Sequence, residues 1–265
     1  MIQALRNAWR LPDVRNKLLF TGFILIVYQF AAHVPVVGVD PAALRSVFEG
    51  NSSAGNLIQV LNLLSGGAVA NFSVIANGVY PYITASIIFQ LLVPIVPALE
   101  QMQREPGGQE KIQRYTYYVA IPMAILQALG QISIFNIAAT STGGAMEIIP
   151  GFGSDVMLTV SVLATMTAGT MFAIWLGELI TEEGIGNGIS IIIFAGIVAM
   201  APQNLIQLLT SQPDRSVYNL ALFIVITVLS VVAVVIIQEG VRRIPVQYGR
   251  RVRGNRQFAQ QDSVI

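Results

Sequence analysis

The chain has 265 residues, of which 54% are hydrophobic and 11% are charged, and its formal net charge is +1. Soluble domains carry about 25% charged residues, so this composition excludes an ordinary soluble domain and indicates a chain surrounded mostly by lipid. The chain has no cysteine and a single histidine, His33. This excludes disulfides and thiolate chemistry and leaves little scope for a zinc site or a histidine base. We therefore expect no metal and no cofactor.

The N-terminal segment, residues 1–17, is basic and precedes an apolar run that begins at Leu18. A basic start, an apolar run and the small residues Ala31 and Ala32 also fit a cleavable signal peptide. However, the charged leader is long, and the apolar run continues past Ala32 as VPVVGV. An uncleaved first membrane helix is therefore the favoured interpretation.

Apolar windows of about 20 residues without charge are typical of membrane-spanning helices. The chain has six such windows, which lie near 18–39, 73–99, 115–138, 156–177, 187–209 and 217–238. We therefore expect an all-α, polytopic membrane protein with six transmembrane helices in this chain.

The interval from Gly50 to Leu99 contains no charged residue. This interval is too long for one membrane-spanning helix and too short for two such helices joined by a soluble loop. Within it, LNLLSGGAVANF (61–72) would make a helix only about 18 Å long, whereas the hydrocarbon core is about 30 Å thick. Gly66 and Gly67 interrupt this stretch, and polar residues are scattered along it. We expect a short re-entrant segment at about 57–71. Such a segment is tolerated only where it is buried in protein or lines a watery cavity.

The basic residues indicate the orientation of the spans. Of the 15 Lys and Arg residues, only Arg45 and Arg215 fall in loops on one side, and the others fall before, between or after spans on the opposite side. The positive-inside rule then predicts that both ends of the chain are cytoplasmic.

Two polar clusters resemble functional motifs only superficially. GIGNG (184–188) follows no strand and lacks the lysine of a phosphate-binding loop. It is better explained by glycines that end one helix and start the next, with Asn187 as a cap. Glu178, Glu182 and Glu183 could be paired catalytic carboxylates, but they have no cationic neighbour in the sequence and are expected to form a solvated face.

His33 lies near the external end of the first span, where we expect an interfacial or helix-packing residue, with a proton relay as the alternative. None of the six spans contains a charged residue. Ion-coupled transporters usually place one there, so a proton- or sodium-driven pump is disfavoured.

Two pairs of aliphatic residues share helix faces. Val79 and Ile83 are four residues apart in the second span, as are Ile189 and Ile193 in the fifth. Thr84, Ser86 and Gln90 add a polar seam beside the first pair. Spacing alone leaves two interpretations open, namely lipid-facing or packing aliphatics and a helix that borders a water path or a neighbouring helix.

Three stretches of the chain carry a stronger signal: LNLLSGGAVANFSVIANGVYPYITASIIFQLL (61–92), WLGELITEEGIGNGISIIIFAGI (175–197) and EGVRRIPVQYG (239–249). They closely resemble the bacterial SecY family, the central subunit of the protein-conducting channel. The family has ten transmembrane helices in two pseudo-symmetric halves arranged like a clam shell. The resemblance implies that this chain contains helices one to six and stops within the following cytosolic loop, as a truncated chain would.

The resemblance implies the following division of the chain. Residues 1–17 are a cytoplasmic basic N-terminus. Residues 18–209 are the N-terminal half of the channel with helices one to five. Residues 210–238 are helix six, and 239–265 are a cytosolic basic loop.

The resemblance also implies roles for particular residues. The re-entrant segment, about 57–71, corresponds to the plug, a short helix. The plug residues, which include Phe72 just after the segment, are Leu61, Leu64, Ser65, Gly66, Gly67, Ala68 and Phe72. The constriction, or pore ring, corresponds to Val79, Ile83, Ile189 and Ile193. The lateral gate corresponds to Thr84, Ile87, Gln90 and Gln127. The contacts to a ribosome or a motor correspond to Arg242, Arg243, Arg250, Arg251 and Arg253, for which topology and anionic lipid binding are the alternative.

A protein with these properties would not be an enzyme. It would conduct unfolded polypeptides across the membrane and release membrane helices laterally, with energy from a ribosome or a motor ATPase. The implied partners are SecE-like and SecG-like small subunits, the ribosome or a SecA-like motor, signal sequences, nascent chains and lipids. The implied location is a bacterial inner membrane or a thylakoid-type membrane. A secondary transporter with broken helices and a non-conducting scaffold that docks ribosomes remain the alternatives.

Overall fold

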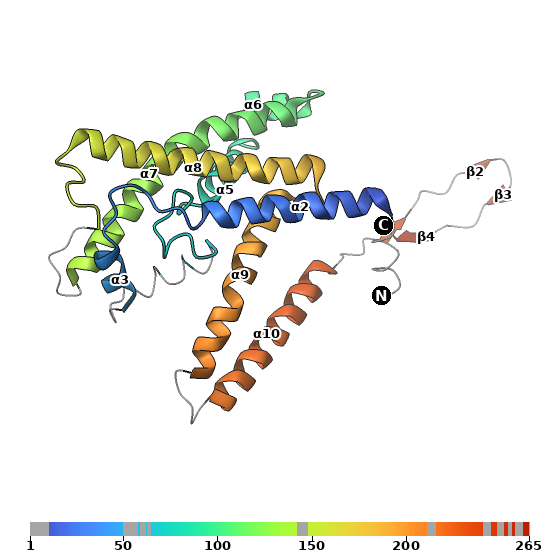
Figure 1. Cartoon of the computed structure of the whole chain (residues 1–265). Coiled ribbons are helices and arrows are strands. Elements are labelled where there is room, and N and C mark those ends of the chain that lie inside the picture. Colours follow the sequence, from blue (N-terminus) through green and yellow to red (C-terminus); the bar gives the residue numbers. More distant parts are fainter. Residues whose placement is uncertain are drawn as a thin grey trace. The chain divides into compact units, whose positions relative to one another are not determined.

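The computed structural model describes residues 11–49, 58, 62, 65–141, 148–210 and 216–240, together with four short strands between 245 and 264 (Figure 1). Contacts divide the chain into two units, 1–202 and 203–265. The first unit contains α2 (Pro12–Ala31), α3 (Pro41–Glu49), α5 (Tyr80–Leu92), α6 (Pro97–Arg104), α7 (Gly108–Ser141), α8 (Val156–Glu183) and most of α9 (Gly188–Thr210).

Helices α7 and α8 form the centre of the first unit. α8 packs against α2 and α7, and α7 also contacts α3, α5 and α6 (Figure 1). The second unit contains α10 (Ser216–Gln238) and the four strands. β1 (Pro245–Gln247) pairs antiparallel with β4 (Asp262–Val264), and β2 (Val252–Arg253) pairs antiparallel with β3 (Arg256–Gln257). These strands were not expected from the sequence, where the segment reads as a basic loop.

Local signals explain where several helices begin. α2, α5 and α6 each have proline within the first two positions, where the missing N–H has no intrahelical partner to lose. Asp155 caps α8, because its carboxylate accepts hydrogen bonds from the N–H groups of Met157 at 2.9 Å and Leu158 at 3.5 Å. Asn187 Oδ1 accepts from the Ser190 N–H at 3.1 Å, which confirms Asn187 as the predicted cap of α9.

The predicted second span, 73–99, is wrong as a single helix. Residues 73–79 form turns with hydrogen bonds such as Gly78 N–H to the Ile75 carbonyl at 2.8 Å. The helix α5 starts only at Tyr80, and α6 follows it at an angle of 101°. Gly78 has a φ of 55°. Pro94 in the connection and Pro97 at the start of α6 deprive the backbone of donors that a continuous helix requires.

The other spans differ mainly in length. Predicted span 115–138 lies within the longer α7, and span 156–177 within α8. The first span is displaced, because α2 covers residues 12–31 and turns follow at 32–39, before the unexpected helix α3. By length and composition, the described helices include three that can cross a membrane, or up to four if the bent α5–α6 pair counts as one span. α2, whose first turns carry Asp13, Arg15 and Lys17, is outside this group.

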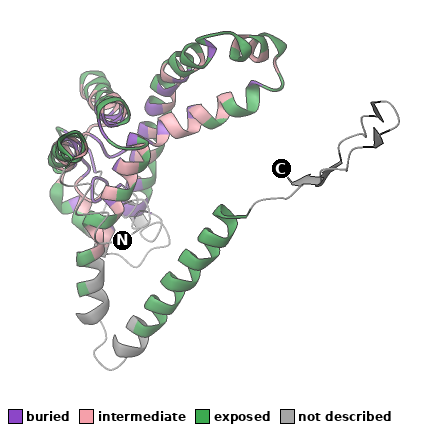
Figure 2. Cartoon of the chain, turned by 90° about the vertical axis from the view of Figure 1, so that its right-hand side faces the viewer, coloured by how far each residue is buried: buried purple, intermediate pink, exposed green. Residues whose placement is uncertain are grey.

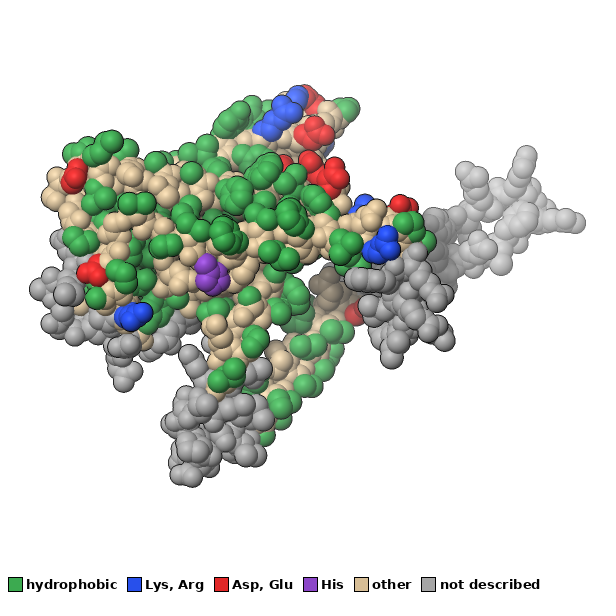
Figure 3. Space-filling view, viewed as in Figure 1, with side chains coloured by type: hydrophobic (Ala, Val, Ile, Leu, Met, Phe, Trp, Pro, Cys, Tyr) green, Lys and Arg blue, Asp and Glu red, His purple; other side chains and the backbone are tan. Residues whose placement is uncertain are grey.

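Three apolar clusters lie in the interior of the described part of the first unit, a small one around Ala85, Ala120 and Ile174 and two larger ones. One of the larger clusters includes Phe72, Phe135, Ile132 and Met166, and the other includes Tyr28, Ala68, Ile75, Val79, Leu176 and Ile192. The outside is also apolar. Figure 3 shows hydrophobic side chains across the middle of the unit's visible face and charged side chains toward its ends.

Helix α10 is the extreme case of an apolar exterior. Every residue of its described part, 221–238, is exposed (Figure 2), although valine, isoleucine and leucine dominate its sequence. A helix that is hydrophobic all round requires lipid or other protein around it. The predicted all-α, multi-pass membrane architecture is therefore confirmed for the described helices.

Candidate functional site: an aliphatic cluster beneath a re-entrant segment

We call the described residues 58, 62 and 65–71 the re-entrant segment. Ile58 and Asn62 are helical, whereas residues 65–71 form turns, because Gly66 and Gly67 have φ values of 68° and 91°, which a right-handed helix cannot contain. The helix that the resemblance implied for about 57–71 therefore does not extend through residues 65–71. The predicted plug residues Leu61 and Leu64 lie outside the described residues.

Internal hydrogen bonds hold the segment together. Asn62 Oδ1 accepts from the Ala70 N–H at 2.7 Å, and the Asn62 carbonyl accepts from the Ser65 hydroxyl at 3.1 Å. Ser65 Oγ in turn accepts from the Val69 N–H at 3.2 Å. Residues 65–69 are buried. The segment therefore satisfies much of its own polar backbone and sits inside protein, as the rule for irregular backbone in membranes requires.

The four predicted pore-ring residues lie in one apolar cluster. Val79, which is 2% exposed, belongs to the core of this cluster, and Ile83, Ile189 and Ile193 pack against it. Val79 immediately precedes α5, Ile83 lies one turn later, and the other two come from the first turns of α9. Ala68 of the re-entrant segment belongs to the same cluster. Residues of α2 and α8 belong to the same cluster, so these four side chains lie where α5, α9, α2, α8 and the re-entrant segment come together.

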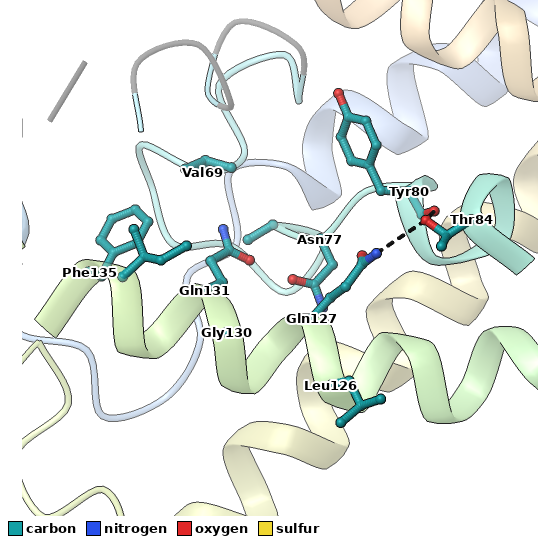
Figure 4. A pocket seen from close by; sticks show the side chains of 11 residues that line it. Val69, Asn77, Tyr80, Thr84, Leu126, Gln127, Gly130, Gln131 and Phe135 are labelled. Carbon is teal, nitrogen blue, oxygen red and sulfur yellow. Dashed lines mark hydrogen bonds between the residues drawn. The ribbon is translucent and has the colours of Figure 1, made fainter. Parts of the chain in front are cut away.

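Only two of the four predicted lateral-gate residues meet. Gln127 Nε2 on α7 donates to Thr84 Oγ1 on α5 at 3.4 Å (Figure 4). Gln90 is exposed and donates instead to Ser86 Oγ at 3.2 Å. Ile87 is 50% exposed, so it faces outward from this part of the chain.

The Thr84–Gln127 pair lines a mostly apolar cavity of about 510 Å³ between the re-entrant segment, α5 and α7. Figure 4 shows Gln127, Gln131 and Phe135 along one side of α7, with Val69 and Tyr80 across from them. Asn77 also lines this cavity. The amide of Asn77 donates to the Ala124 carbonyl at 3.2 Å and fastens the chain that follows the re-entrant segment to α7. Sequence reasoning missed this contact, although a buried amide within a charge-free run was a usable signal.

The expectation that Glu178 belongs to a solvated face is wrong. Its carboxylate accepts a hydrogen bond from the Tyr117 hydroxyl at 2.6 Å, across α7 and α8. Tyr117 also stacks on Tyr82, with ring centroids 5.4 Å apart. Glu182 and Glu183 are exposed, as expected. Spacing within one helix could not reveal a partner that the fold supplies from another helix.

The glycines of GIGNG have the structural role that the sequence indicated. Gly184 follows the last residue of α8, and its N–H donates to the Ile180 carbonyl at 2.9 Å. Gly188 begins α9. His33 is exposed, and its Nδ1 lies 2.8 Å from the Gln29 carbonyl. A nitrogen facing a carbonyl oxygen acts as the donor.

Four of the five predicted ribosome- or motor-binding arginines, Arg242, Arg243, Arg250 and Arg251, lie outside the described residues. Arg253 lies in β2, where its backbone pairs with Arg256 of β3. Among the described residues, no group of three or more His, Cys, Asp or Glu side chains could hold a metal ion.

Comparison with known proteins identifies the family. The family model SecY matches residues 73–265. The chain is 39% identical to the protein translocase subunit SecY of Streptomyces scabiei over 97% of this chain and 60% of that protein. It is also 39% identical to the protein translocase subunit SecY of Pseudomonas aeruginosa, over 99% of this chain and 57% of that protein. The chain thus spans about 60% of the length of such relatives.

A solved structure described as "The structure of a protein conducting channel" matches 98% of this chain and 57% of its own, with a TM-score of 0.50 and 17% sequence identity. At this identity the match concerns the fold alone. The matching family model, together with the apolar helices described above, shows that this chain has the helices of a multi-pass membrane protein and belongs to the SecY family.

Proposed function

We propose that this chain contributes the constriction and the stopper of a passive, gated conduit for unfolded polypeptides. The observation that carries the proposal is the convergence of Val79, Ile83, Ile189 and Ile193 in one apolar cluster that also contains Ala68 of the re-entrant segment. The names of the relatives, protein translocase subunit SecY, agree with this function.

The chemistry of the cluster suits a barrier to water and ions. Branched aliphatic side chains offer no hydrogen bonds, so a narrow ring of them excludes water and ions by dewetting. The same side chains would let a polypeptide pass without holding it, because they bind neither its amides nor its charges. Such a ring performs no bond chemistry, and the energy for movement comes from a ribosome or a motor ATPase.

The re-entrant segment suits a removable stopper. The glycines and alanines at positions 66, 67, 68 and 70 have little side chain to pack, and elements with few contacts open at low free energy. Its hydrogen bonds from Asn62 and Ser65 are internal, so they can persist when the segment moves as a unit.

The remaining parts of the mechanism follow the family resemblance. Thr84 and Gln127, which contact each other, together with Ile87 and Gln90 would form one side of a lateral path to lipid for signal sequences and membrane helices. The other side would come from the family's helices seven and eight. The arginines of the C-terminal segment 239–265 would contact ribosomal RNA phosphates bidentately or dock a SecA-like motor. SecE-like and SecG-like subunits would complete the assembly in a bacterial-type or thylakoid-type membrane. In this arrangement residues 1–17 and 239–265 face the cytoplasm, and 18–209 and 210–238 contribute to the two halves of the channel.

Ion leak through the complete protein in proteoliposomes tests the constriction. Replacing Ile83 and Ile193 together by serine should raise the leak, because hydroxyl groups wet the ring. The matched control is Ile26→Ser, since Ile26 is 70% exposed on α2. If the double serine variant is as tight as the control and exports protein normally, the proposal fails.

Crosslinking tests the path of the substrate. Because the chain has no native cysteine, single cysteines can be placed at Ile83, Ile193 or the control Ile26. A stalled translocating polypeptide should crosslink to the first two positions and not to the third, and equal crosslinking at all three would contradict the proposal. Deletion of residues 57–71 separates the alternatives, because a conduit should leak, a transporter should lose solute flux and a ribosome-docking scaffold should do neither.

A further inference from the structure

The backbone of the re-entrant segment packs closely against a glycine of one helix, and the backbone of the chain that follows it packs closely against a glycine of another. A Cβ built on Gly66 would lie 2.6 Å from the Cα of Gly196 on α9, and a Cβ built on Gly196 would lie 3.3 Å from the Cα and N of Gly66. A Cβ built on Gly169 of α8 would overlap the Val74 carbonyl oxygen and lie 2.6 Å from its carbon. Both approaches depend on the absence of a side chain.

The contact at Gly169 lies within a firmly fixed region. The Val36 N–H donates to the Phe72 carbonyl at 3.0 Å, and the Val74 N–H donates to the Val34 carbonyl at 2.9 Å. The Phe72 ring is fully buried and meets the Phe135 ring edge to face, with centroids 5.3 Å apart. Hydrogen bonds and aromatic packing therefore hold the chain at residues 72–74.

The contact at Gly196 is held much more weakly. Gly66 and Gly67 lie against α9 through the Gly196 backbone and the Met200 side chain, whose sulfur would be 3.2 Å from a Cβ on Gly67. The Gly67 N–H donates within the segment, to the Asn62 carbonyl at 3.1 Å. Among the described residues, the hydrogen bond from this end to another helix is a long one, from Gln29 Nε2 to the Gly66 carbonyl at 3.4 Å. Close packing against a glycine, rather than hydrogen bonding, therefore determines how well this end fits.

The Gly66 contact and two of the four predicted pore-ring residues lie on one face of helix α9. Ile189, Ile193, Gly196 and Met200 are spaced by four, three and four residues, which is the spacing of a single helix face. Any displacement of α9 that moves Ile189 and Ile193 apart from α5 therefore also shifts the surface on which Gly66 rests.

We propose that Gly196 is the release point of the re-entrant segment. It is a positioning residue on which the stopper rests, while residues 72–74 act as the fixed pivot, and α9 couples the widening of the ring to release of the stopper. The role of Gly196 in gating rests on the proposed function, but its role in holding the segment does not.

The test uses the complete protein in proteoliposomes with a single reporter cysteine, Ala68→Cys, at a position that is fully buried. A membrane-impermeant maleimide labels this cysteine only when the segment leaves its place. Gly196→Ala adds a Cβ 3.3 Å from the Gly66 backbone and should raise the labelling rate roughly 5-fold, as expected for overpacking at the low end of its usual cost. Gly196→Leu, which has a longer side chain, should raise it further. The matched control is Gly22→Ala on α2, where an added Cβ meets nothing within 4 Å.

Ion leak is measured on the same proteoliposomes. Faster labelling in the Gly196 variants alone, with increased leak, supports both the release point and the stopper. Faster labelling without leak supports the release point and refutes the stopper. Unchanged labelling in Gly196→Ala, or an equal rise in Gly22→Ala, overturns the inference even if serine replacement of the ring causes leak. Gly196→Ala decides the question if Gly196→Leu does not fold, because alanine favours the helix over glycine.

Discussion

Replacing Gly169 by alanine should destabilise the protein, whereas the same replacement at Gly130 should stabilise it slightly. Both glycines lie inside long helices, α8 and α7, so both variants gain about 1 kcal/mol of helix propensity. At Gly130 an added Cβ meets nothing within 4 Å, but at Gly169 it would lie 2.6 Å from the carbonyl carbon and Cγ1 of Val74. Ordinary carbon contacts are about 3.5–4.0 Å, so the backbone at Val74 must move by roughly 1 Å.

The comparison isolates the clash because the propensity gain is common to both variants and cancels. Overpacking of this kind costs typically about 1–3 kcal/mol. For a chain of this size each kcal/mol shifts the apparent Tm by about 2–4 °C, so the two variants should differ by roughly 2–12 °C.

The assay is thermal unfolding followed by circular dichroism, with both variants of the complete protein in the same detergent. Gly169→Ala should melt below the parent and Gly130→Ala at or above it. Equal melting of the two variants would refute the close approach of the 72–74 region to α8, and with it the fixed pivot of the re-entrant segment.

Two further predictions concern contacts between and within the helices. Asp155→Ala should remove the cap of α8 at a cost of about 1 kcal/mol, and hydrogen exchange at the first-turn amides of α8 should become faster, whereas the exposed Ser161→Ala should leave it unchanged. Tyr117→Phe should lower the free energy of unfolding by about 1.5–3 kcal/mol, because it leaves the Glu178 carboxylate without its hydroxyl donor. The assay is a urea titration with Tyr118→Phe, at a more exposed position, as the control. Equal unfolding midpoints for the two variants would contradict the contact between Tyr117 and Glu178.

Local sequence signals predicted much of the secondary structure. The start of α8 at Val156 and the cap of α9 by Asn187 agree with prediction, because a cap is satisfied by N–H groups two or three residues away. The second span was predicted wrongly because mean hydropathy measures side-chain polarity and takes no account of which residues can donate a backbone hydrogen bond. Pro94 and Pro97 leave an apolar window unchanged while they prevent a continuous helix.

The candidate site was predictable only in part. The four-residue spacing of Val79 with Ile83, and of Ile189 with Ile193, assigns each pair to one helix face, but it does not distinguish lipid from protein as the neighbour. The family resemblance suggested that the two pairs meet, and the structure places them in one cluster. The acceptor of the Tyr117 hydroxyl is Glu178, 61 residues away in the sequence, and nothing local to either residue indicates the other.

The sequence by itself determined that this protein is surrounded mostly by lipid, because the chain is apolar and weakly charged and forms membrane helices. It also determined much of the local geometry, since capping residues and glycines indicate where helices begin and end. Those properties depend on composition and on neighbours a few residues apart. The tertiary structure alone decided that Gly66 rests on Gly196 and that Val74 crosses Gly169. A glycine in the sequence indicates only that a side chain is absent. Which backbone packs into that space depends on how helices that are distant in the sequence pack together.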